Sequence, residues 1–228
     1  RIDRLAAADK WLLQAAAVVG RHVPYPLLRE VADVPEATLR ASLDHLQAGE
    51  FMYERGLVPD LEYAFTHALT HDVAYGSLLH ERRDGLHREI LLAMERLYPD
   101  RVAEQVELRA HHAFRGEGWD KAVHYLRQAG LKAAERAANP EAGACFEQAR
   151  SALARLPASR EVTEQAVDVR LEMRPPLLQL GDLGRVHALS QEAEALANEI
   201  GDEPRLARVY TYLINYHYLK GEPDLAIA

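Results

Sequence analysis

Apolar residues in the first fifty positions recur at intervals of three and four, which is the period of an α-helix. Three blocks follow this pattern, over residues 7–19, 24–32 and 35–48. In the third block, leucines recur at i, i+4 and i+7 from Leu39, and a proline stands at the first helical position, where it is well tolerated. The pattern therefore predicts three short helices at the start of the chain.

The next stretch has the composition of two short strands. Residues 51–54 and 61–65 are rich in aromatic and other strand-forming side chains, and residues 56–60 between them supply glycine, proline and aspartate for a turn. A β-hairpin is the expected result. Three helices followed by a hairpin is the element order of a winged-helix domain.

From residue 66 onward the pattern is helical throughout, and a turn motif repeats. In this motif a glycine and an acidic residue precede a small side chain that enters the next helix. Copies of the motif occupy residues 115–122, 180–186 and 220–226, with a shorter turn of the same kind at 139–142. The spacing from Gly181 to Gly221 is 40 residues, close to the period of about 34 of tetratricopeptide (TPR) repeats. Tight turns and small residues let antiparallel helices pack closely.

These patterns predict a mainly α protein with two regions. We expect a winged-helix domain over residues 1–80 and an α-solenoid of TPR-like helical hairpins over residues 81–228, truncated at the C-terminus. Pro175 and Pro176 interrupt the repeats, so a break or a sharp kink is expected there.

Charge and composition narrow the classes of partner. The chain has 27 Lys and Arg against 35 Asp and Glu, a formal net charge of −8, and neither region has the basic excess that binding to a phosphate backbone requires. We therefore expect no nucleic-acid partner. No apolar run is long enough to span a membrane, and the single cysteine, Cys145, suits a reducing compartment. A cytoplasmic location is the resulting prediction.

Motifs for catalysis do not occur in this sequence. There is no G-x-x-x-x-G-K-[ST] phosphate loop, no GxGxxG and no GxSxG. His67 and His71 have the spacing of two zinc ligands on a helix, but Ala68 stands where a zinc hydrolase carries its glutamate base. We predict no catalytic residue and no metal site, and we expect Leu69 and Val73 of the same helix to pack in a core. The chain begins without Met and stops inside an apparent helix, which favours an internal piece of a longer protein.

One stretch resembles a known family. Residues 65–87, FTHALTHDVAYGSLLHERRDGLH, are similar to the end of the winged-helix domain in STAND-type signal-transducing ATPases. Residues 66–74 align with the segment that carries the Met-His-Asp motif in the plant immune-receptor relatives, with Thr66 at the Met position and Ala68 at the Asp position. Only His67 matches. The resemblance extends over essentially the whole chain and is closest to bacterial proteins that place this architecture behind a class III adenylate or guanylate cyclase domain.

The resemblance implies a regulatory role. In the family the histidine at the position of His67 reaches the β-phosphate of bound ADP and holds the resting state. It implies a nucleotide-binding domain upstream in cis, ADP or ATP with Mg in the full-length protein, and an attached effector domain. The helical repeats would then receive a protein or a small effector, with ligand-induced oligomerisation as one outcome. An alternative reading of His67 is that it caps or packs at the start of its helix.

Two other functions remain open at the level of sequence. One is an autonomous TPR adaptor, and the other is a transcriptional regulator whose winged helix binds DNA. For partner binding on the repeats the candidates are Tyr212, Tyr216 and Tyr218, which crowd one helix; packing is the alternative role of these tyrosines.

Overall fold

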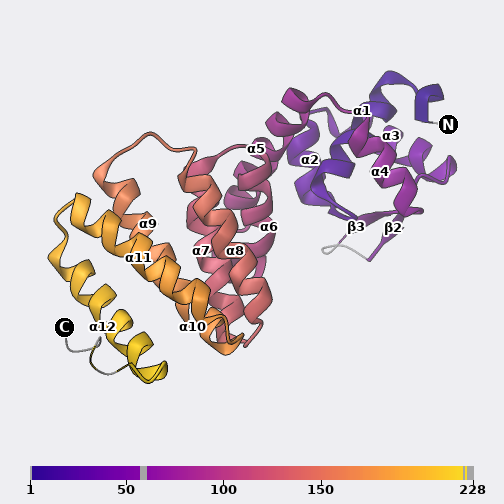
Figure 1. Ribbon diagram of the computed structural model, residues 1–228. Helices are drawn as coiled ribbons and strands as arrows, with labels where there is room; N and C mark the ends of the chain where they lie inside the picture. The colour runs from indigo at the N-terminus through magenta and orange to yellow at the C-terminus, as the bar shows by residue number, and fades with distance from the viewer. Residues whose placement is uncertain (1, 57–60, 223, 225–228) are drawn as a thin grey trace. The chain divides into compact units, whose positions relative to one another are not determined.

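The computed structural model describes residues 2–56, 61–222 and 224 of the chain (Figure 1). The protein is mainly helical and carries one small three-stranded sheet. The described residues divide into two compact units. The first unit comprises the described residues up to Gln105 together with Arg115–Gly118. The second unit comprises Val106–Phe114 and the described residues from Trp119 onward.

The first unit begins with three helices and contains the sheet. Its elements are η1 (Ile2–Arg4), α1 (Ala7–Val19), β1 (His22–Pro24), α2 (Tyr25–Ala32), α3 (Glu36–Ala48), β2 (Met52–Arg55), β3 (Glu62–Phe65), α4 (Ala68–Gly76), α5 (His80–Leu97) and η2 (Pro99–Arg101). Helices α1 to α3 and the β2–β3 hairpin lie where the hydrophobic pattern predicts them.

The sheet has one strand more than the predicted hairpin. Its order is β1-β3-β2 with antiparallel pairing, and Val23 of β1 lies opposite Tyr63 of β3. The sequence analysis took Pro24 for the opening of a helix, whereas it both ends β1 and precedes the first residue of α2. A proline is tolerated there because β1 is an edge strand.

The core of the first unit continues past residue 80. Leu13, Leu28 and Leu43 from the first three helices are completely buried or nearly so, and Ile90 and Met94 of α5 belong to the same cluster. Helix α5 packs against α1 and α2. The sequence analysis had placed α5 with the repeats, but its apolar face completes the core of the first unit, so the compact unit extends to Gln105.

In the described residues of the second unit, all regular secondary structure is helical. Helix α6 (Val102–Arg115) leads into it, followed by α7 (Trp119–Glu135), α8 (Asn139–Leu153), α9 (Arg160–Glu172), α10 (Arg174–Gln179), α11 (Leu183–Glu199) and α12 (Glu203–Leu219). The predicted break at Pro175 and Pro176 is confirmed, since α9 ends at Glu172 and the two prolines lie in the separate short helix α10.

Small residues and tight turns bring the helices of this unit together. In the α7–α8 hairpin Ala122, Ala142 and Ala149 are buried with Phe146, and α9 and α12 both pack against α11. Gly181 has a φ of 75° and Gly201 a φ of 62°, a backbone conformation that favours glycine. Asp182 and Asp202 follow these glycines and cap α11 and α12 by accepting backbone N–H bonds. The Gly201-Asp202 turn was not among the predicted copies of the motif, and residues 223, 225 and 226 of the predicted third copy lie outside the described residues.

Candidate functional site

His67 is exposed at the start of α4. It is the N-cap residue of that helix, with an extended backbone (φ −135°, ψ 135°), and its carbonyl oxygen accepts a bond from the Thr70 N–H at 3.0 Å. Among the described residues its imidazole makes no capping hydrogen bond. The side chain at position 67 is therefore accessible to a group from outside the unit.

His71, one turn further along, is held inside the unit. Its ring meets the edge of Phe65 at a centroid distance of 5.2 Å and stacks on Tyr75 at 6.3 Å. The Tyr75 hydroxyl lies 3.1 Å from Nε2 of His87, a residue that is 1% exposed. These four side chains form an aromatic column that joins β3, α4 and α5. The two histidines that share a face in the sequence thus have different roles in the structure.

Two apolar residues on the outer face of α4 are exposed, although the sequence pattern predicted that they would be buried. Leu69 is 73% exposed and Val73 is 49% exposed, although the sequence analysis expected both to pack in a core. The reason is that α4 is short and its inner face is already filled by Ala74, which is completely buried, and by His71 and Tyr75. Leu78, just after the helix, does pack against the core of the first unit.

The three tyrosines proposed for partner binding occupy different environments on α12. Tyr218 is 73% exposed, while Tyr216 is 8% exposed and stacks on His187 of α11 at 4.4 Å. Tyr212 packs partly into the core between α9, α11 and α12, and the Arg174 guanidinium lies 4.4 Å from its ring centre. The three side chains therefore do not form one exposed surface, and Tyr216 has little side-chain surface left for a partner.

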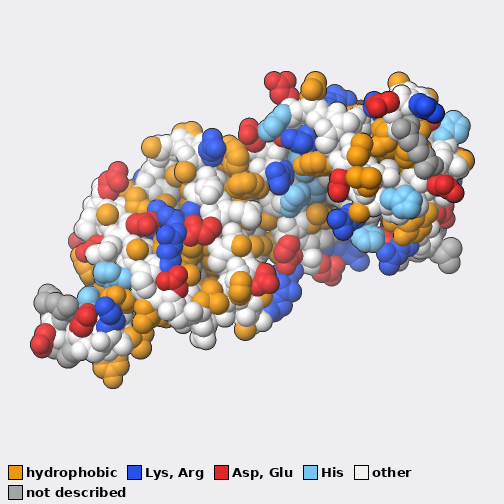
Figure 2. Space-filling view, turned by 45° about the vertical axis from the view of Figure 1, so that its right-hand side comes forward, with side chains coloured by type: hydrophobic (Ala, Val, Ile, Leu, Met, Phe, Trp, Pro, Cys, Tyr) orange, Lys and Arg blue, Asp and Glu red, His pale blue; other side chains and the backbone are white. Residues whose placement is uncertain are grey.

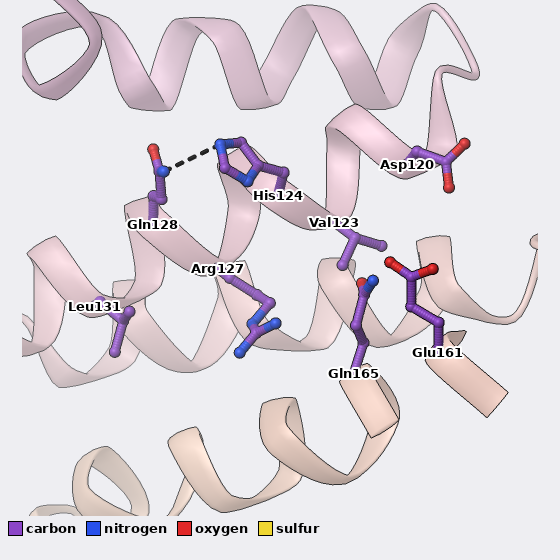
Figure 3. Close-up of a pocket in the computed structure, with 8 residues that line it drawn as sticks. All are labelled: Asp120, Val123, His124, Arg127, Gln128, Leu131, Glu161 and Gln165. Carbon is purple, nitrogen blue, oxygen red and sulfur yellow. Dashed lines mark hydrogen bonds between the residues drawn. The ribbon is translucent and has the colours of Figure 1, made fainter. Parts of the chain in front are cut away.

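A groove lies between α7 and α9 in the second unit, with a volume of about 480 Å³ (Figure 3). We call it the α7–α9 groove. Helix α7 contributes Asp120, Val123, His124, Arg127, Gln128 and Leu131, and helix α9 contributes Glu161 and Gln165. The α7 residues follow one another at helical spacing, so they occupy one face of that helix. This polar stripe was present in the sequence, but its closure into a groove depends on α9 and could not be predicted from α7 alone.

The one arginine of the groove is already paired. Arg127 donates from Nε to Glu172 Oε2 at 3.0 Å and from its terminal nitrogen to the other carboxylate oxygen at 2.5 Å. The Glu172 carboxylate raises the pKa of Arg127 against the opposing effect of burial. Asp120 and Glu161, in contrast, have no ion-pair or hydrogen-bond partner within the part of the chain that the structure describes. The groove thus has two uncompensated carboxylates and a neutralised cation.

Basic and acidic side chains are mixed elsewhere on the second unit. Glu192 of α11 accepts from both Arg150 and Arg170 at 2.9 Å, and Glu147 accepts from Arg185 at 2.6 Å. Figure 2 shows the same mixing on the face it presents, where Lys and Arg side chains lie beside Asp and Glu instead of forming one broad basic patch.

The described residues contain neither a candidate metal site nor a candidate membrane span. No three histidine, cysteine, aspartate or glutamate side chains there come close enough together to hold a metal ion. In the same residues, none of the helices combines the length and the apolar character needed to cross a membrane.

No protein-family model matches the chain. A protein of Rhizobium meliloti (strain 1021), described only as uncharacterized, is 29% identical over 150 residues, which is 65% of this chain and 14% of that protein. The match therefore spans a small part of the relative's length.

One solved structure aligns with 99% of this chain and 50% of its own chain. It is a Signal Transduction ATPase with Numerous Domains (STAND) protein with a tetratricopeptide repeat sensor, from Pyrococcus horikoshii, with 12% sequence identity and a TM-score of 0.28. A TM-score of this size does not establish a shared fold.

Proposed function

We propose that this chain is the regulatory and sensor segment of a multidomain STAND-type ATPase. In this proposal the first unit is the winged-helix domain of the module and the second is a TPR-like sensor. The segment itself catalyses nothing. It couples the binding of a partner or effector on the repeats to the ADP or ATP state of an upstream nucleotide-binding domain, and so controls an attached effector domain, for which a class III nucleotide cyclase is our candidate.

The observation that carries the proposal is the position of His67. It is the one residue of the family's motif that this sequence retains, and it stands exposed on an extended backbone at the start of α4. A protonated imidazole donates charge-assisted hydrogen bonds to phosphate oxygens, and these bonds are lost when the two domains separate. An exposed histidine at the start of a helix is suited to reach a nucleotide held by a neighbouring domain.

ADP or ATP with Mg would be bound by the full-length protein and not by this segment alone. In the resting state His67 would contribute one contact to the β-phosphate of ADP. When the nucleotide domain moves away, that contact is lost, and a ligand shifts such an equilibrium only through contacts that differ between the two states.

A second candidate function is an autonomous adaptor that binds a partner protein. The α7–α9 groove favours this candidate, because it is formed by two helices of the second unit and needs no other domain. The two candidates differ in whether nucleotide binding depends on His67.

DNA binding through α3 has less support. Arg40, the arginine of that helix, forms an ion pair with Glu36 at 2.8 Å. A phosphate backbone would have to compete with this pair on a chain of net charge −8.

The test is calorimetry of ADP and ATP binding to the full-length protein and to its His67→Ala variant. A charge-assisted hydrogen bond contributes about 1.5 to 3 kcal/mol, so ADP affinity should fall about tenfold to a hundredfold. ATP affinity should fall less, because the contact is made in the ADP-bound resting state. Basal effector output should rise.

Thr66→Ala is the matched control, since Thr66 is the exposed neighbour of His67. His71→Ala is unsuitable as a control because it would disturb the aromatic column. If His67→Ala and Thr66→Ala change ADP affinity equally, His67 does not contact the nucleotide. This result would favour the adaptor function over the ATPase-linked sensor function.

A further inference from the structure

The α7–α9 groove has the length of a short extended peptide. Its α7 residues run from Asp120 to Leu131, which at a rise of about 1.5 Å per residue corresponds to about 16 Å along the helix. An extended chain advances about 3.3 Å per residue, so about five residues of an extended segment match this length. Val123 also lines the groove but is only 1% exposed, so the accessible apolar side chain of this face is that of Leu131.

One end of the groove is negatively charged. Asp120 lies in the first turn of α7 and Glu161 in the first turn of α9, and both lie toward the same side in Figure 3. Acidic residues in a first turn also stabilise the helix dipole, which alone would explain their presence. These two nevertheless line one groove, and Arg127, the arginine among its described lining residues, is already paired with Glu172.

The rest of the groove offers hydrogen bonds and an apolar contact. Nε2 of Gln128 lies 3.0 Å from Nε2 of His124, and Gln165 of α9 lines the groove near Val123 and Glu161 (Figure 3). Amide side chains both donate and accept, so they can pair with the backbone of an extended peptide. At the end opposite the carboxylates, Leu131 is 44% exposed.

We propose that the α7–α9 groove binds an extended segment of a partner protein that carries a lysine or arginine at the Asp120 and Glu161 end and an apolar residue toward Leu131. The inference rests on the proposed sensor function and specifies its partner. Charge complementarity favours a basic partner segment, because a lysine or arginine side chain would compensate the two carboxylates that are unpaired within the described chain. An acidic segment or a free C-terminal carboxylate is disfavoured, because Arg127 is already neutralised by its bidentate pair with Glu172.

The experiment selects binders from a displayed library of random peptides on this chain, and measures their dissociation constants by fluorescence polarisation. The expected selection is a basic residue with an apolar one about four positions away from it in the peptide. Exposed ion pairs contribute modestly, so the double variant Asp120→Asn/Glu161→Gln should weaken binding about three- to thirtyfold. Leu131→Ser should relax the selection at the apolar position.

The matched control is Glu141→Gln/Glu203→Gln. These two glutamates are also exposed first-turn residues, of α8 and α12, but they do not line the groove. The control removes the same charge and the same kind of helix-dipole interaction, and should change affinity less than about twofold.

Three outcomes would overturn the inference: selection of acidic segments or free carboxyl ends, peptides whose affinity falls equally in both double variants, or no selected peptide at all. None of these affects the nucleotide measurement with His67→Ala. Failure of the groove is therefore distinguishable from failure of the sensor function. Conversely, a basic peptide that binds as predicted while His67→Ala leaves ADP affinity unchanged would identify the chain as an adaptor.

Discussion

Arg205 of α12 donates two hydrogen bonds to the carboxylate of Asp168 of α9, from Nε to Oδ1 at 3.1 Å and from the terminal nitrogen to Oδ2 at 2.9 Å. Asp168 also lies 3.4 Å from Arg208 and 4.0 Å from Arg127. One carboxylate thus links arginines from α7 and α12, and the acidic partners raise the pKa of Arg205, with Asp168 the largest cause. This arrangement ties together the helices that flank the α7–α9 groove and the tyrosine-rich helix α12.

We expect Asp168→Asn to destabilise the second unit. The substitution removes the charge shared by the arginines while keeping the size of the side chain, and hydrogen bonds to charged groups contribute about 1.5 to 3 kcal/mol. Urea unfolding should show a loss of this order. Glu199→Gln, an exposed residue of α11, is the control and should change stability by less than about 0.5 kcal/mol. Equal effects would mean that the ion pairs add nothing to stability.

Asp202 should make stability depend on pH in the acid range. The Arg205 backbone N–H and then its guanidinium hold the pKa of Asp202 below its ordinary value of 3.8. The unfolded chain therefore takes up a proton first as the pH falls. The contribution of Asp202 is fully present above the ordinary value and is lost as the pH drops through the depressed value.

Urea unfolding at a series of pH values measures this effect. Asp202→Asn should be less stable than the parent at neutral pH, and the difference should shrink as the pH falls below about 4. Glu203→Gln, the exposed neighbouring residue, should follow the parent curve. A difference between Asp202→Asn and the parent that stays constant over the whole range would contradict the role assigned to this carboxylate.

Most helices could be predicted from the sequence because their apolar residues follow the helical period within one element. Helix α1 has the predicted bounds for this reason. Strand β1 was missed because a three-residue strand carries too short a pattern, and its stability comes from pairing with β3, which is distant in sequence. The assignment of α5 failed in the same way: Leu86, Ile90 and Met94 predict a buried face but do not specify which helices cover it.

The candidate sites show the same limit. The spacing of His67 and His71 places both on one helical face, but only the fold reveals that Phe65 and Tyr75 enclose the second and leave the first exposed. The tyrosines of α12 are a similar case, because burial of Tyr216 depends on His187 of α11. Local spacing predicts which residues share a face, and tertiary packing decides which of them remain available to a partner.

The different surroundings of the two histidines predict different effects on stability. His71→Ala removes two ring contacts and opens a gap in the aromatic column, which should lower the free energy of unfolding by about 1 to 3 kcal/mol. His67→Ala, at an exposed position, should change it by less than about 0.5 kcal/mol. Thermal and urea unfolding of both variants test this, and a large loss in His67→Ala would show that this side chain serves packing.

Gly130 of α7 lies close to Phe146 of α8, which yields a prediction with an internal control. A Cβ added at Gly130 of α7 would lie 2.7 Å from Cε1 of Phe146 on α8, whereas one added at Gly143 of α8 would meet nothing within 4 Å. Both glycines are in helix interiors, where alanine is favoured by about 0.5 to 1 kcal/mol. Gly143→Ala should therefore stabilise the protein by about that amount.

Gly130→Ala should do the opposite, because the clash falls on a ring that is 0% exposed and cannot move into solvent. Overpacking of a core typically costs about 1 to 3 kcal/mol, which exceeds the gain in helix propensity. The double variant Gly130→Ala/Phe146→Leu separates this clash from other effects, since the smaller side chain makes room for the new methyl group. Gly130→Ala should lower stability less in the Phe146→Leu background than in the parent, as measured by urea unfolding. If Gly130→Ala alone stabilises the protein as much as Gly143→Ala does, the two helices are further apart than the structure places them.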